Sequence, residues 1–227
     1  MVVTLNRPAI TQAPQAGSAR SQVERLGEGN YRVGAMLVNT GTREVSIPGT
    51  LNEITTVEFV AAATDGAKAY ESAVTLDTDA VSFNAALLLI GLDPARGKPS
   101  RKQFDPVAPE GDPVELFIEI SGGDKPRRVR LEEILFDQGT KKSLTAGPWV
   151  YTGSTFVTTA DGSRFMAEAD GVLIGLMHGP SAIIDSPRND LLGRFGALIL
   201  NPTLAKAGMK VAVIVRALPL PGRPKLK

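Results

Sequence analysis

Residues 31–52 run YRVGAMLVNTGTREVSIPGTLN and contain the pattern that decides the fold. Two runs rich in strand-forming side chains, 31–39 and 43–52, flank the polar tetrapeptide NTGT at residues 39–42. Such runs on either side of a short turn are typical of a β-hairpin, because Asn and Gly adopt the backbone angles that tight turns need. We therefore predict an antiparallel hairpin here.

The same pattern recurs twice further along the chain. The runs 55–63 and 68–76 flank a turn that contains Asp65-Gly66, and Asp-Gly is a strong short-range hairpin signal. The runs 113–120 and 127–135 flank a second turn rich in Gly, Asp and Pro. Each pair predicts a further antiparallel hairpin.

Residues 79–92, DAVSFNAALLLIGL, predict a helix between the second and third hairpins. An Asp or Thr within residues 77–79 can cap its N-terminus, and Gly91 can end it. A helix so nearly apolar all round is expected to be buried against the sheet that the hairpins build. Asn84 in its middle then needs a hydrogen-bond partner.

These elements predict the fold class and the domain organisation. The last third of the chain continues with short strand-compatible runs and Gly-containing turns, so strands do not alternate regularly with helices. We expect a β-rich α+β fold in which antiparallel hairpins form a sheet or open barrel around one buried helix. Residues 1–30 are expected to form a flexible N-terminal arm, 31–218 a single globular domain, and 219–227 a Pro- and Lys-rich tail.

The composition excludes several classes of function. The chain has 227 residues with no cysteine and a formal net charge of +1. Disulfides, thiolate nucleophiles, Cys-ligated zinc and iron–sulfur clusters are therefore excluded, and we expect no cofactor. The balanced charge argues against nucleic acid as a partner. The longest apolar run, residues 85–90, is too short to cross a membrane, which takes about 18–20 residues.

The candidate catalytic residues are few. The chain has one histidine, His178, and lacks the G-x-S-x-G and H-E-x-x-H motifs. Glu71 and Asp185 could supply two carboxylates for acid–base chemistry beside His178. A histidine at a strand end before Gly-Pro is, alternatively, an ordinary surface residue. We predict no metal site, and the sequence favours a non-catalytic protein while leaving the question open.

A polar loop near residue 185 is the main candidate for ligand binding. Short charged and amide side chains gather there, at Asp185, Arg188, Asn189 and Asp190. Such groups can bind a cation or orient a small ligand, but Asp and Asn also form ordinary turns by bonding their own backbone. Glu71 could face this loop and complete a site.

Trp149 and Tyr151 are a second candidate for ligand binding. They alternate on one face of a predicted strand, where exposed rings could form a platform for a sugar or a peptide. With one Trp and three Tyr in the whole chain, core packing is the alternative use.

Several motifs in order resemble the YdjY-type domain, a family found in bacterial envelope and exported proteins. The resemblance covers about residues 45–218. It is carried by these segments: AYES (69–72), NAALLLIGLDP (84–94), GDPV (111–114), GPWVYTGS (147–154), EADG (168–171) and SAIIDSPR (181–188). The family pattern has a His where this chain has Tyr70. Some members are described as ferredoxin-like, but a chain without cysteine cannot ligate their cluster.

The resemblance implies a periplasmic or exported protein whose signal peptide is absent from this chain. We therefore expect a non-catalytic binding or accessory module of the bacterial cell envelope, with a protein or a saccharide as partner. One alternative is a hydrolase or cation-assisted enzyme that uses Glu71, His178 and the loop 185–190. Another is a structural protein that assembles through an edge strand, for which the apolar run 210–218 is the candidate.

Overall fold

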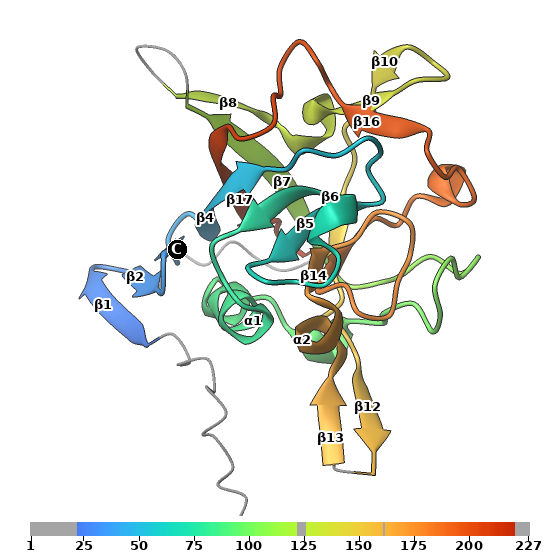
Figure 1. Ribbon diagram of the computed structural model, residues 1–227. Coiled ribbons are helices and arrows are strands. Elements are labelled where there is room, and N and C mark those ends of the chain that lie inside the picture. Colours follow the sequence, from blue (N-terminus) through green and yellow to red (C-terminus); the bar gives the residue numbers. More distant parts are fainter. Residues whose placement is uncertain (1–21, 122–125, 161, 221–227) are drawn as a thin grey trace, which may run out of the picture.

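The computed structural model describes residues 22–121, 126–160 and 162–220, and a closed barrel of eight strands forms its centre (Figure 1). In order around the barrel, the strands are β4 (Glu44–Leu51), β17 (Lys210–Ala217), β7 (Asp112–Ile120), β11 (Trp149–Tyr151), β15 (Ile184–Asp185), β14 (Val172–Ile174), β5 (Phe59–Ala63) and β6 (Ser72–Leu76). β6 pairs back onto β4 and closes the ring. The predicted β-rich class is confirmed, but the barrel is closed and not open.

The remaining strands extend or flank the barrel. β3 (Met36–Asn39) pairs with the first half of β4, and β2 (Asn30–Val33) and β1 (Val23–Gly27) continue outward from it. β8 (Arg127–Arg130) pairs with β7. A separate three-stranded sheet contains β9 (Leu135–Asp137), β10 (Lys142–Ser143) and β16 (Leu198–Leu200). The hairpin of β12 (Phe156–Thr159) and β13 (Gly162–Phe165) stands alone.

Two of the three predicted hairpins form, and one is wrong. β3 pairs antiparallel with β4 and β7 with β8, as predicted. β5 and β6, in contrast, are parallel, with Phe59 opposite Ser72. The Asp65-Gly66 turn does form, but residues 64–71 then run back along β5 through a short 3-10 helix (Ala69–Glu71) before β6 begins. β6 thereby lies antiparallel to β4, the pairing that closes the barrel.

Helix α1 (Ala80–Leu89) forms where predicted. Asp79 caps it by accepting a hydrogen bond from the backbone N–H of Ser82, and Gly91 follows with a φ of 84°. Half of its residues are buried and one, Leu88, is 44% exposed, so the predicted helix buried on all sides within the hairpins is not confirmed. The helix lies beside the second helix, α2 (Met166–Asp170), below the barrel in Figure 1.

One hydrophobic cluster extends from Val33 to Ala217 and fills the barrel. Residues 1–21 of the predicted arm and 221–227 of the predicted tail lie outside the described residues, while Val23–Gly27 form β1. The division into arm, domain and tail therefore stays a prediction. No helix in the part of the chain that the structure describes is long and apolar enough to cross a membrane.

The apolar run 210–218 is not an edge strand. β17 pairs with β4 on one side and β7 on the other, each over seven residue pairs. A strand inside a closed barrel has a partner strand on each edge, and its inward-facing side chains fill the core. This central position explains the apolar side chains of β17.

Candidate functional site

Asp185 and His178 are the two predicted site residues that the structure brings together. Asp185 lies on β15 and is fully buried. Its carboxylate accepts hydrogen bonds from the backbone N–H groups of Gly179 (2.9 Å) and Ser186 (2.8 Å). Burial raises the pKa of Asp185 to about 7, although these N–H groups oppose the shift. The carboxyl group therefore ties the loop after β14 to β15.

His178 is buried, at 1% exposure, and is not the surface histidine that its neighbours in sequence suggest. Its Nδ1 lies 2.7 Å from the carbonyl oxygen of Asp105, which can only accept, so we assign the proton to Nδ1. Nε2 is buried and has no hydrogen-bond partner in the described part of the chain. The backbone N–H of Phe104 donates to the His178 carbonyl. His178 thus joins its loop to the loop that contains Asp105.

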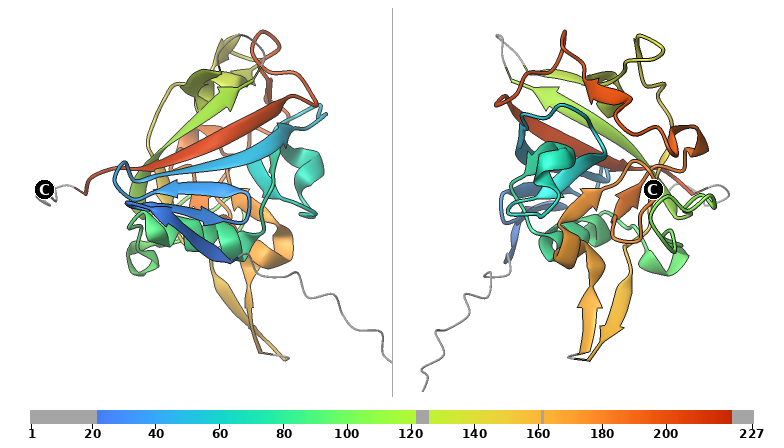
Figure 2. Two further views of the ribbon diagram at one scale, coloured as in Figure 1. Left: turned by 90° about the vertical axis from the view of Figure 1, so that its left-hand side faces the viewer. Right: turned by 45° about the vertical axis from the view of Figure 1, so that its right-hand side comes forward.

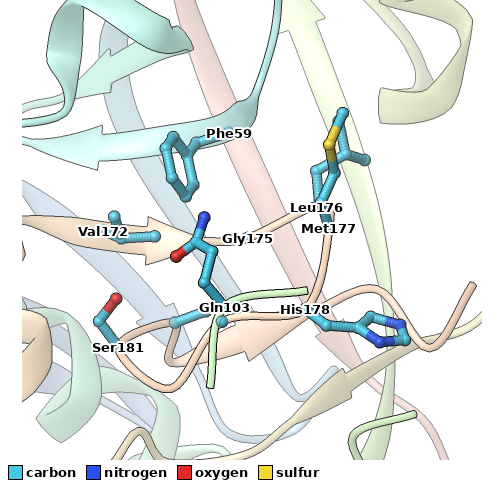
Figure 3. A pocket seen from close by; sticks show the side chains of 10 residues that line it. Phe59, Gln103, Val172, Gly175, Leu176, Met177, His178 and Ser181 are labelled. Atoms are coloured by element: carbon cyan, nitrogen blue, oxygen red, sulfur yellow. The ribbon is translucent and has the colours of Figure 1, made fainter. Parts of the chain in front are cut away.

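A cavity of about 10 Å³ is lined by His178 and by Gly179, the residue that bonds Asp185 (Figure 3). It has room for about one water molecule. Figure 3 shows the side chains of Phe59 and Gln103 pointing toward one another across it, while the His178 imidazole points away. The arrangement can hold the two loops in place, but it has no space for a substrate.

Glu71 lies apart from this pair. It ends the 3-10 helix before β6 and forms an ion pair with Lys68 at 3.2 Å. The Lys68 ammonium also lies over the rings of Phe59 and Tyr70, at 5.8 and 5.7 Å from their centres. The contacts of Glu71 therefore do not join it to His178 or Asp185.

The polar loop after Asp185 turns outward. Arg188 donates to both carboxylate oxygens of Asp190 and to the carbonyl oxygen of Thr145. Hydrogen bonds from Arg188 lower the pKa of Asp190. Asn189 and Asp190 begin a short 3-10 helix and are exposed. These contacts pair Arg188 with Asp190 and tie it to the distant residue Thr145, while Asp185 is buried at the start of the loop. Whether the loop binds a ligand or is an ordinary turn stays a prediction.

Trp149 and Tyr151 lie in the core of the barrel. The indole N–H of Trp149 donates to Glu132, and the hydroxyl of Tyr151 donates to Asn84 at 2.7 Å. This bond supplies the partner that Asn84 needs within α1. Burial raises the pKa of Tyr151 above its ordinary value. Neither ring is exposed as a platform.

A much larger hollow, of about 420 Å³, lies on the outer face of strands β1 to β4, which are in front in the left view of Figure 2. We call it the groove. It is lined by Leu26, Asn30, Tyr31, Leu37, Val38, Asn39, Glu44 and Ser46. Leu26 and Leu37 are 44% and 51% exposed. Sequence analysis missed the groove because the hairpin pattern of residues 31–52 predicts strands but does not show which side chains stay exposed on their outer face.

The side chains of Asn30, Asn39 and Glu44 in the groove already bond one another or their neighbours. The Asn39 amide donates to Asn30 at 2.9 Å. Burial opposes ionisation of Glu44, but hydrogen bonds from Arg128 and Arg216 outweigh it and lower the pKa. The groove therefore offers mainly apolar surface, with the hydroxyls of Tyr31 and Ser46 as its remaining polar groups.

In a comparison with known protein families, the chain matches the YdjY domain. The match covers residues 36–216, which include β3 and the barrel except Ala217, the last residue of β17, but not β1 and β2. No curated protein and no solved structure matches the chain.

Proposed function

The chain belongs to the YdjY domain family, and we propose that it is a non-catalytic binding module whose groove accepts apolar side chains of a partner polypeptide. The observation that carries this proposal is the groove itself, with Leu26 and Leu37 exposed at its surface. A groove of about 420 Å³ falls within the range of roughly 300–1,000 Å³ that is usual for ligand sites.

The chemistry of the groove favours a polypeptide over a saccharide. A sugar is usually held by free hydrogen-bonding groups and by an exposed aromatic ring. Here Asn30, Asn39 and Glu44 already have partners, and Tyr31 packs against the hydrophobic core. Apolar side chains need no such groups, since burying apolar surface contributes about 25 cal/mol per Å².

The closed surroundings of Asp185 and His178 support a module without catalysis. Both side chains are almost wholly buried, and the adjoining cavity of about 10 Å³ cannot take a substrate. Enzyme activity through Glu71, His178 and the loop 185–190 stays an untested alternative.

Leu37→Asp is expected to weaken peptide binding at least about tenfold, because a carboxylate in the groove must be desolvated when an apolar side chain covers it. The probe is a set of dye-labelled peptides with leucine or valine at alternate positions, measured by fluorescence anisotropy. For a groove of this size we expect dissociation constants on the order of 10–100 µM.

The matched control is Val107→Asp. Val107 is 57% exposed and lies outside the groove, so this change adds the same charge to a similarly exposed site. It should leave binding unchanged. The proposal fails if no peptide of the set binds, or if both substitutions weaken binding equally.

A location in the cell envelope is the second part of the proposal, and the family resemblance supports it. The natural gene, with any codons upstream of Met1, can be fused to alkaline phosphatase, which is active only outside the cytoplasm. We expect an active fusion. An inactive fusion of full length would place the protein inside the cell and contradict this part alone.

A further inference from the structure

The hairpin of β12 and β13 projects from the body of the protein (Figures 1 and 2). The two strands pair with each other from Phe156 opposite Phe165 to Thr159 opposite Gly162, and with no other strand of the described residues. An isolated two-stranded hairpin is at best marginally stable in water. A projecting hairpin with two free edges therefore calls for an explanation.

The base of this hairpin is firmly attached. Phe165 is buried in the core, and its ring lies 5.1 Å from that of Phe156. The backbone N–H of Met166 donates to the carbonyl oxygen of Thr155, and β13 leads directly into α2. The strands are thus held at one end, while their edges remain exposed.

The edge of β12 is short, at four residues, but it lacks the charges, prolines and bulges that protect many free strands. Such edges usually carry charges, proline or a bulge that prevents pairing with another chain. β1, the outermost strand beyond β4, has Glu24, Arg25 and a register shift before Gly27. β12 has the sequence FVTT, without charge, proline or bulge, and its Phe156 is 67% exposed.

We propose that β12 pairs antiparallel with β12 of a second copy, so that two hairpins form one four-stranded sheet. When the two copies of β12 overlap fully, the two-fold axis lies between Val157 and Thr158, and each residue faces a residue of the same short strand. The surface must therefore be compatible with itself. β12 meets this requirement because it carries no charge. β13 does not, since its Arg164 would approach a second Arg164. The contact is separate from the groove.

The association should be weak because the contact is small. We expect sedimentation velocity to show a monomer at about 10 µM and a growing dimer fraction toward about 1 mM, the range typical of small interfaces. Val157→Lys should abolish the dimer by placing like charges on the shared edge. Ser163→Lys on β13 is the matched control and should dimerise, as should Leu37→Asp in the groove.

A single introduced cysteine tests the geometry directly. The natural chain has none, so each variant carries one unique thiol. Thr158 and Ser163 face each other across the hairpin at the same distance from its base. Under mild oxidation Thr158→Cys should form a covalent dimer at least about tenfold faster than Ser163→Cys, because a disulfide needs Cα atoms within about 7 Å.

Three results would overturn the proposal. They are a monomer throughout the concentration range, a dimer that survives Val157→Lys, and equal cross-linking rates for the two cysteine variants.

Discussion

Gly111→Ala is expected to lower the free energy of unfolding by at least about 3 kcal/mol. A Cβ atom at Gly111 would overlap the carbonyl oxygen and carbon of Tyr151, which are backbone atoms of β11. β11 cannot move aside easily, because it pairs with β7 on one edge and β15 on the other. The clash would also loosen the segment before β7, which contains Gln103, a residue that lines the small cavity.

The measurement is unfolding by urea, with Gly147→Ala as the control. A Cβ at Gly147 meets no atom within 4 Å, so this variant should stay within about 0.5 kcal/mol of the natural protein. Equal unfolding midpoints for the two variants would contradict the close approach of residue 111 to β11.

Asp185 is expected to make the protein less stable as the pH rises from about 4 to about 7. Burial raises the pKa of Asp185 to about 7 in the folded state, from 3.8 in the unfolded chain. Because the folded state holds the proton more tightly, this stabilisation is complete below about pH 4 and is lost as the pH rises through 7. The difference in pKa corresponds to about 4 kcal/mol.

Comparison with Asp185→Asn isolates this effect. Other carboxyl groups change stability in the opposite direction, such as Asp105, whose pKa is lowered to about 2 by its hydrogen bond with Arg101. The unfolding free energy of the natural protein minus that of Asp185→Asn should therefore fall by about 4 kcal/mol between about pH 4 and pH 8. Asp190→Asn, at an exposed carboxylate in the same loop, should show no such loss. A constant difference for Asp185→Asn would mean that Asp185 stays ionised throughout.

Local signals in the sequence were enough for some elements and not for others. The turn between β3 and β4 and the cap and end of α1 depend on residues within a few positions, so Gly91 and a cap within residues 77–79 could be predicted; the structure selects Asp79 as the cap. The direction of β6 depends on its pairing with β4, about 25 residues earlier in the chain. An Asp-Gly turn therefore predicted an antiparallel pair where the barrel contains a parallel one.

The candidate site shows the same division. Residue type singled out Asp185, His178 and Trp149 as chemically capable, but burial decided what they do. Trp149 fills the core and Asp185 holds a loop, whereas the ordinary leucines at positions 26 and 37 face a groove. A hydrophobic residue in a strand can face either the core or solvent, and a short pattern does not show which.

The sequence by itself determined that this is a β-rich, cysteine-free member of the YdjY domain family, because composition and the order of short motifs can be identified without knowing which residues are in contact. Only the tertiary structure decided that the barrel closes, that β17 is central and that the free edges are elsewhere. The physical reason is that the backbone hydrogen bonds of strand edges and the apolar contacts of buried faces are made with segments that are distant in the chain. Which surface remains for a partner is settled only after those pairings are complete.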